Sequence, residues 1–223
     1  MNLHHFRIAV TDLFLARSCS GCSALGTLLC PLCQAALLPR PGVHEFLVHS
    51  GLQWLPTAYS GAYQGVLRRV LYTYKDHHIP ELADQLSPLL AAAISAVRDH
   101  AGAGPLIRVV PVPSRRAAIR RRGFDPVHQL LRSMERRQLG GHGVIAPWLQ
   151  DLRGSGASKR LDRSSRLQAS SAAFVATPDV VAGTDVIVVD DIITTGSTIS
   201  EAARTLEKAG CQVRGVAAIA HTL

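Results

Sequence analysis

The stretch from Asp185 to Thr198 constrains the fold of this chain more than any other part of the sequence. It contains an apolar run, Val186–Val189, which ends in two carboxylates at Asp190 and Asp191. A short β-branched run of this kind is typical of a strand buried on both faces. The residues that follow are rich in hydroxyls, include one glycine and lead into the helical pattern of Thr198–Ala209. The stretch therefore predicts a strand, a short loop and a helix in immediate succession.

Strands and helices are expected to alternate along the rest of the chain. The other expected strands are Ile107–Val112, Gly143–Pro147 and Val213–Ala220. Helical spacing of apolar residues is found at Ala62–Lys75, at Glu81–Arg98 and from Val127 onward. Strands that alternate with helices form a parallel sheet with helices on both faces. We therefore expect an α/β fold.

The apolar segments are too short for a membrane protein. The longest of them, Leu89–Val97, is interrupted by Ser95 and falls well short of the ~20 residues that a membrane-spanning helix needs. Charged residues at Arg7, Asp12 and Arg17 surround the apolar stretch near the N-terminus, which is not a secretory pattern. We expect a soluble protein that stays in the cytoplasm.

Positive charge is concentrated in the middle of the sequence. The formal net charge is +8, and Arg108–Arg166 alone carries thirteen Arg and one Lys against four acidic residues. Guanidinium groups match the geometry of phosphate oxygens, so an excess of arginine favours a phosphate-rich partner. A nucleic acid, a polyphosphate small molecule and a merely solvated basic surface all fit this charge.

Four of the five cysteines form two Cys-x-x-Cys pairs near the N-terminus. They are Cys19, Cys22, Cys30 and Cys33. Two such pairs at close spacing are typical of a tetrathiolate zinc site, and four soft sulfur ligands suit zinc better than a hard cation. Two redox pairs, two disulfides and an iron–sulfur centre are the alternatives. The fifth cysteine, Cys211, is expected to be a small buried apolar residue.

The cysteine pairs are expected to belong to a module of their own. Leu37–Gly42 reads as a linker, which divides the chain into a zinc knuckle module at 1–42 and a larger domain at 43–223. About 40 residues cannot bury enough surface to fold unaided, so the metal there would be structural.

The loop after Asp191 has the composition of an anion-binding site. Ligands of open parallel sheets bind at the carboxyl ends of the strands, where backbone N–H groups, hydroxyls and a helix N-terminus can meet. Gly196 would let the backbone approach a phosphate, and Thr198 with Glu201 would form a capping box. Asp190 and Asp191 can accept hydrogen bonds from a diol. The sequence therefore fits a ligand with a phosphate next to a sugar diol.

Rival nucleotide and metal motifs are absent from the sequence. No G-x-x-x-x-G-K-[ST] is present, and no G-x-G-x-x-G follows a strand. The aspartates also lack the alternate-residue spacing of a calcium loop.

The stretch Asp190–Thr198 closely resembles the phosphoribosyl-diphosphate (PRPP) signature of type I phosphoribosyltransferases. The chain as a whole resembles one branch of them, the ComF family of competence-associated proteins, in its four cysteines and in three further pieces: Tyr72–Lys75, Pro111-Val112-Pro113 and Arg122-Gly123-Phe124. There are departures from the family pattern. Asp125-Pro126 stands where the family has Asn-Gln, and Ser158 and Ala169 stand where it has Gln and Asn.

The resemblance implies that the chain transfers a phosphoribosyl group from PRPP to a nitrogenous acceptor and releases pyrophosphate. Asp190 and Asp191 would hold the ribose hydroxyls and act in catalysis, and Mg²⁺ would accompany PRPP. The 5-phosphate would bind to Thr194, Thr195, Gly196, Ser197 and Thr198. The pyrophosphate would bind to Ser114, Arg115 and Arg116, with help from Arg122 and Lys75. The basic, glycine-rich segment Asp151–Arg166 is expected to be a mobile lid over the pyrophosphate.

Two other function classes stay open at this stage. One is a PRPP-binding module without turnover. The other is a nucleic-acid-handling protein in DNA uptake, as the ComF resemblance implies, with Arg108–Arg166 and the zinc knuckle as contacts. Aromatic residues make up only 5% of the chain, which weakens the case for a base-stacking platform. The sequence does not identify the acceptor.

Overall fold

The computed structural model describes residues 18–104, 106–139, 143–153 and 173–222. Its main sheet has seven strands: β1 (Gly42–His49), β2 (Trp54–Ala62), β9 (Gln212–His221), β7 (Asp185–Val189), β3 (Arg108–Pro111) and β4 (Val144–Ile145) in spatial order, with β8 (Ile192–Ile193) paired to β9. The β1–β2 pair is antiparallel, and the other pairs in this sheet are parallel. A second, small sheet pairs β5 (Leu149–Asp151) with β6 (Phe174–Ala176).

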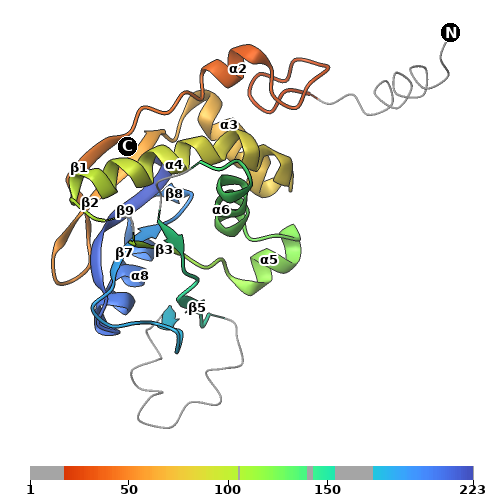
Figure 1. Ribbon diagram of the computed structural model, residues 1–223. Coiled ribbons are helices and arrows are strands. Elements are labelled where there is room, and N and C mark those ends of the chain that lie inside the picture. Colours follow the sequence, from red (N-terminus) through yellow and green to blue (C-terminus); the bar gives the residue numbers. More distant parts are fainter. Residues whose placement is uncertain (1–17, 105, 140–142, 154–172, 223) are drawn as a thin grey trace.

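Helices cover both faces of the main sheet (Figure 1). The first face carries α3 (Gly65–Asp76), α4 (Ala83–His100) and α6 (Pro126–Arg136), and the second carries α8 (Ser197–Lys208). Shorter helices are α2 (Pro31–Ala35), the 3₁₀ turn η1 (Pro80–Leu82) and α5 (Arg116–Arg122).

The apolar run of β7 explains this two-faced burial. Ile187 and Val189 pack into the core under α3, α4 and α6, whereas Val186 and Val188 pack into the core under α8. Successive side chains of a strand point to opposite faces, so a strand covered on both sides needs apolar residues at every position. The predicted α/β fold with a mostly parallel sheet is therefore confirmed.

The expected elements appear with small shifts in their ends, and some elements were not predicted. The helix expected at Ala62–Lys75 begins only at Gly65, because the chain before it continues β2. The β1–β2 hairpin, α5 and the β5–β6 pair had no counterpart among the expected elements. Leu37, at the start of the expected linker, is buried in the core under α3 and α4, and Gly42 opens β1.

Within the described ranges, no helix is both long and apolar enough to cross a membrane.

Candidate functional site

A cavity of about 280 Å³ lies at the carboxyl ends of β3 and β7. Its walls come from α3, the segment after β3, α5, the end of β5, and the stretch from Asp190 to the start of α8. The lining residues are Lys75, Val112, Pro113, Ser114, Arg115, Ala118, Arg122, Arg153, Asp190, Asp191, Ile192 and Thr198. The fold thus brings together side chains from four distant parts of the sequence, and the walls combine two carboxylates with one lysine and three arginines.

Most of the site residues expected from the sequence meet at this cavity. Both aspartates line it, as do Thr198 and four of the five residues assigned to pyrophosphate: Lys75, Ser114, Arg115 and Arg122. The fifth, Arg116, is an exposed residue at the start of α5 and is not part of the lining. The other four residues of the phosphate loop, Thr194, Thr195, Gly196 and Ser197, lie beside the cavity rather than in its wall.

The two carboxylates are held in a defined arrangement by the end of β7. The Asp191 backbone N–H donates to Asp190 Oδ1 at 2.8 Å, and Lys75 Nζ donates to Asp191 Oδ1 at 2.8 Å. The Asp191 side chain is only 6% exposed, so the lysine is its counter-charge in a nearly buried position. The remaining Oδ2 atom of each aspartate has no hydrogen-bond partner among the residues that the structure describes. Each carboxylate therefore keeps one acceptor available.

Burial and mutual repulsion change the acid–base properties of this cluster. Burial, reinforced by the neighbouring Asp191 carboxylate, raises the pKa of Asp190 well above its usual range, although Lys75 opposes the shift. Burial alone would lower the pKa of Lys75, but the attraction of Asp191 outweighs it and leaves that pKa raised. Lys75 is accordingly a stable cation next to two carboxylates that repel each other.

Gly196 turns the chain from the hydroxyl loop into α8. It adopts a left-handed backbone, with φ 74° and ψ −8°, and is the N-cap of the helix. The expected capping box of Thr198 and Glu201 is therefore wrong: the helix begins one residue earlier, at Ser197, and Glu201 pairs instead with Arg204, at 2.6–3.0 Å. Gly196 offers no side-chain acceptor to the first N–H groups of α8, and the Ser197 N–H donates to Thr195 Oγ1 at 3.4 Å instead. These donors remain directed toward the cavity end of the helix.

The hydroxyls of the loop are accessible and close together. Thr195 Oγ1 and Ser197 Oγ are 3.0 Å apart, and both residues are exposed, as are Thr194 and Thr198. Exposed hydroxyl groups next to the N–H groups and the positive end of a helix are suited to a phosphate group.

Three arginines, Arg115, Arg122 and Arg153, form a basic wall of the same cavity. The Nε atom of Arg122 is buried and has no hydrogen-bond partner, which is an unusual state for a cationic donor. Arg153 lies 4.9 Å above the ring of Phe174, and its guanidinium group bonds to Asp151 at 2.7–3.2 Å. Of the lid expected at Asp151–Arg166, only residues 151–153 fall in the described part, since residues 154–166 lie outside it.

Asp125 joins the loop after β3 to α6. Its Oδ2 accepts the Ser114 N–H at 3.1 Å, and its Oδ1 accepts the His128 N–H at 3.2 Å as the N-cap of α6. This role was not predicted, although an aspartate followed by a proline at the first helical position is a known helix-start pattern. The departure from the family's Asn-Gln thus replaces an amide with a carboxylate that positions Ser114. The other two departures, Ser158 and Ala169, lie outside the described residues.

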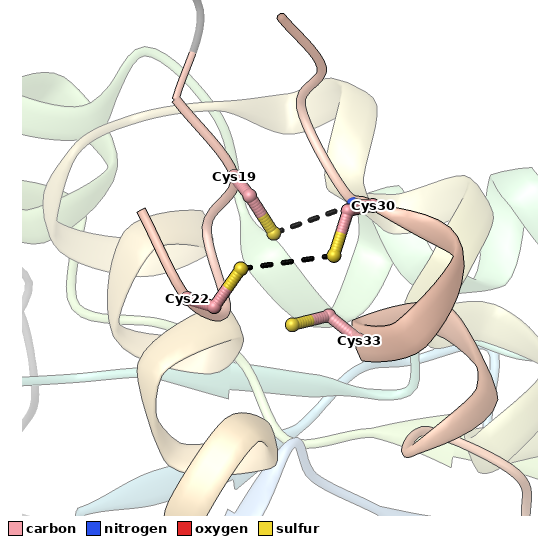
Figure 2. Close-up of side chains that lie close together, drawn as sticks. All are labelled: Cys19, Cys22, Cys30 and Cys33. Carbon is pink, nitrogen blue, oxygen red and sulfur yellow. Dashed lines mark hydrogen bonds between the residues drawn. The ribbon is translucent and has the colours of Figure 1, made fainter. Parts of the chain in front are cut away.

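The four cysteines form a second cluster, which lies at the other end of α3 (Figure 2). Their sulfur atoms all lie within 4.8 Å of one another, and Cys22 Sγ is 3.7 Å from Cys30 Sγ. Four sulfurs at the zinc–sulfur distance of 2.3 Å in a tetrahedron lie about 3.8 Å apart. All four thiols are free, so the alternative of disulfide pairs does not describe this arrangement. The cluster therefore has the ligands and the spacing to bind zinc.

Backbone donors stabilise one sulfur in particular. The N–H groups of Gly21 and Cys30 donate to Cys19 Sγ at 3.4 and 3.3 Å. Burial alone would raise the pKa of Cys19, but these backbone donors outweigh it and lower that pKa to about 6. Burial raises the pKa of Cys33 to about 12. A Cβ atom at Gly21 would lie 2.5 Å from Cys33 Sγ, so only glycine fits at this position of the first Cys-x-x-Cys pair, where it packs against the second.

The cysteine segment also contacts the main body of the protein. Arg69 of α3 donates to the Gly21 carbonyl, and Gln34 Nε2 donates to Gln85 Oε1 at 2.9 Å. Leu28 and Leu29 pack against the core under α3 and α4. The helix α3 is thus shared by the cysteine cluster and by the cavity.

Comparison with known protein families decides what kind of domain surrounds the cavity. Residues 117–222 match the family model of the phosphoribosyl transferase domain. This part of the chain, a little under half of it, is similar to a phosphoribosyl transferase domain. The matched range includes the phosphate loop and both aspartates, but not α3, the cysteine cluster or Ser114–Arg116. A search of curated proteins found no match to the chain.

The match to this domain family supports phosphoribosyl transfer from PRPP as the general activity, with PRPP as a ligand. It also agrees with the geometry, because the free carboxylate oxygens and the phosphate loop both fall within the matched range.

Proposed function

We propose that this chain is a cytoplasmic phosphoribosyltransferase of the ComF type, which transfers a phosphoribosyl group from PRPP to a nitrogenous acceptor and releases pyrophosphate. Support for the ComF type comes from the combination of a phosphoribosyl transferase domain with four clustered cysteines in one chain. Free thiols that can bind metal also fit a reducing compartment such as the cytoplasm. In this proposal, residues 1–42 are the zinc knuckle module and residues 43–223 are the phosphoribosyltransferase-like domain.

The observation that supports the proposal most is the pair of unoccupied carboxylate oxygens beside the phosphate loop. A ribose ring offers two neighbouring hydroxyl donors, and Asp190 and Asp191 each keep one acceptor for them. The start of α8 follows within a few residues and offers N–H groups and hydroxyls to the 5-phosphate. A ligand with a diol next to a phosphate thus finds both of its groups matched.

The basic wall is suited to the pyrophosphate end of PRPP. Ser114, Arg115, Arg122 and Arg153 line the same cavity as the two aspartates. Arg122 Nε is a buried donor without an acceptor, and a pyrophosphate oxygen would supply one. We assign no contact to Arg116, which lies outside the lining.

Catalysis would depend mainly on position and charge. Departure of pyrophosphate leaves positive charge on the ribose carbon, and the carboxylates of Asp190 and Asp191 stabilise that charge from a fixed position. The arginines stabilise the negative charge that develops on the leaving group. Mg²⁺ would arrive with PRPP and neutralise its phosphates, held mostly by ligand and water oxygens. Zinc would be structural, since the cysteine cluster lies away from the cavity.

Binding and turnover are tested separately. Isothermal titration calorimetry with PRPP and Mg²⁺ should give one site per chain, and Asp190→Asn with Asp191→Asn in one chain should weaken it about ten- to a hundredfold or more. Asp185→Asn is the matched control, because Asp185 begins the same strand at its far end and pairs with Arg214. Unchanged PRPP binding in the double variant would refute the site.

Turnover then distinguishes an enzyme from a PRPP-binding module. Pyrophosphate release in the presence of purified nitrogenous bases should depend on both the base and Asp190. If PRPP binds tightly and no base from a broad panel increases pyrophosphate release, the chain is a binding module.

A nucleic-acid contact, as in a protein of DNA uptake, is the second candidate function. The helix α5 presents Arg116, Arg120 and Arg121 as exposed side chains without an ion pair to any described residue. Their exchange for glutamine should weaken binding of a labelled oligonucleotide and reduce the salt dependence of that binding. Equal binding by the variant would exclude α5 as the contact.

A further inference from the structure

The ammonium group of Lys75 forms an ion pair with Asp191. Lys75 Nζ lies 2.8 Å from Asp191 Oδ1, and the lysine side chain is 21% exposed. This lysine comes from α3, outside the residues that match the phosphoribosyl transferase family. The sequence led us to expect Lys75 at the pyrophosphate. Its position next to the carboxylate pair suggests a different role.

The helix that carries Lys75 is firmly held. The adjacent Tyr74 is fully buried and its hydroxyl donates to the Pro126 carbonyl at 2.7 Å. The ring of Tyr74 also packs against Phe124, and Val70 and Leu71 are fully buried on the same helix. The backbone at Lys75 is therefore fixed relative to the segment that leads into α6. A lysine on a fixed backbone can hold a partner carboxylate in one orientation.

We propose that Lys75 is a positioning residue of the PRPP site, which acts through Asp191 by neutralising this carboxylate and fixing its free oxygen toward the ribose. The inference rests on the proposed function, because it concerns how the same site binds PRPP. It assigns to α3, an element outside the matched family range, a part in the recognition of the ribose.

Charge explains why the site would need such a residue. Asp190 and Asp191 lie next to each other in sequence and face a ligand that carries several negative charges of its own. The other charged groups around the cavity are Arg115, Arg122 and Arg153 on the basic wall and Asp125 behind Ser114. Only Lys75 forms an ion pair with either aspartate among the described residues. A nearly buried carboxylate without a partner is strongly disfavoured, so loss of this lysine would leave Asp191 without its counter-charge and without the bond that orients it.

Hydrogen bonds determine which oxygen of each aspartate stays available to a ligand. Lys75 occupies Oδ1 of Asp191, and the Asp191 N–H occupies Oδ1 of Asp190. Both bonds leave the Oδ2 atoms free, one on each residue. If Lys75 moved to a pyrophosphate oxygen, Asp191 would lose the bond that orients it. An ammonium group has three N–H donors and this bond uses one of them, so a direct contact with pyrophosphate is a separate role that experiment must distinguish from positioning.

A double-mutant cycle separates the two roles. PRPP binding with Mg²⁺ is measured by calorimetry for the unaltered chain, Lys75→Met, Asp191→Asn and the double variant. A positioning role predicts that Lys75→Met weakens binding roughly tenfold or more. In the Asp191→Asn background, the same change should have little effect, because a neutral amide needs no counter-charge. Lys75→Arg should restore most of the affinity, and Arg68→Met, which removes an exposed charge from the same helix, should change nothing.

Free pyrophosphate with Mg²⁺ provides an independent readout. A positioning role predicts that Lys75→Met binds pyrophosphate as the unaltered chain does. A direct contact predicts a loss of pyrophosphate affinity and an equal effect of Lys75→Met in both Asp191 backgrounds, and either result overturns the inference.

Should Lys75→Met fail to fold, Lys75→Gln is carried through the same cycle. If the unaltered chain does not bind PRPP, the proposed function fails and this inference with it. If the unaltered chain binds PRPP but the cycle shows no coupling between Lys75 and Asp191, only this inference fails.

Discussion

The cavity and the cysteine cluster both lie against α3, but they are maintained in different ways. At the cavity, the carboxylates already have partners within the chain, namely the Asp191 N–H and Lys75, and strands buried on both faces support them. At the cluster, Cys22 and Cys30 are not buried, and among the residues that the structure describes the backbone donors to a cluster sulfur reach Cys19 alone. The fold therefore forms the cavity by itself, whereas we propose that the cysteine cluster needs a bound zinc ion to hold its thiolates together.

Removal of the zinc ligands should produce the largest effect and should leave the cavity intact. Binding of structural zinc is worth about 10–16 kcal/mol in zinc-finger peptides, so Cys30→Ser with Cys33→Ser should lose the metal entirely. The zinc content found by metal analysis should fall from about one zinc per chain, the count for a single tetrathiolate site, to none. Cys211→Ser, which alters a cysteine outside the cluster, is the control.

The same variant tests whether the two regions are independent. Protease cleavage around residues 18–36 should increase, while PRPP affinity stays close to that of the unaltered chain, because Val70, Leu71 and Tyr74 hold α3 in the main core. Full retention of zinc would refute the cluster as its site. A collapse of PRPP binding would show that the cavity depends on the cluster.

The hydroxyl of Thr195 should contribute the next largest effect. Thr195→Val removes one donor to the phosphate, and a lost hydrogen bond to a charged group is worth about 1.5–3 kcal/mol, which corresponds to a loss of about ten- to a hundredfold in PRPP affinity. Thr205→Val is the matched control, since the Thr205 hydroxyl bonds to the Glu201 carbonyl within α8. Calorimetry with PRPP measures both. Equal affinities of the two variants would remove Thr195 from the phosphate site.

Replacement of Gly196 by alanine should have a smaller effect on PRPP affinity than Thr195→Val. Alanine in a left-handed conformation costs about 1–2 kcal/mol, and Gly196 has φ 74°. An added Cβ would meet Val48 at an ordinary 3.5 Å, so the cost comes from the backbone and not from a clash. Gly196→Ala should lower both the free energy of unfolding and the affinity for PRPP. Gly104→Ala, at a position with no positive φ and open space, is the control.

The smallest expected effect is a pH-dependent gain of stability when Asp190 is replaced. The raised pKa of Asp190 means that the folded chain holds this proton more tightly than the unfolded chain does. The folded state therefore loses stability as the pH rises from the unfolded pKa to the folded one, and the full cost is present above the folded pKa. Asp190→Asn should stabilise the ligand-free chain most at high pH.

Thermal unfolding between pH 4 and 9 measures this gain. It should shrink as the pH falls, by at most about 1.4 kcal/mol per pH unit. Asp76→Asn, at the exposed end of α3, should show no such trend. A gain that does not vary with pH would mean that the Asp190 charge carries no cost in the folded chain.

Much of the cavity could be predicted because its residues follow buried strands. The apolar runs before Asp190 and before Ser114 identify two strands whose carboxyl ends meet at one edge, which brings together side chains far apart in sequence. The cysteine spacing likewise predicted a cluster, since two short pairs close in sequence cannot separate far.

Other features depend on contacts that a sequence pattern does not record. The strand β1 has mostly exposed residues and no clear alternation, so its pairing with β2 was not visible. The cap at Gly196 was missed because Thr198 and Glu201 match a capping box, while Glu201 in fact binds Arg204. The partner of Lys75 was missed because the choice between a carboxylate and a phosphate depends on where α3 ends.

A crystal structure of the chain soaked with PRPP and Mg²⁺ is the most direct test of the account. We expect the two ribose hydroxyls within hydrogen-bond distance of the free Oδ2 atoms of Asp190 and Asp191, and the 5-phosphate at the N-terminus of α8. We also expect Lys75 to remain on Asp191 and the pyrophosphate to lie against Arg115 and Arg122. PRPP bound away from the two aspartates, or a ribose that contacts neither of them, would contradict the account.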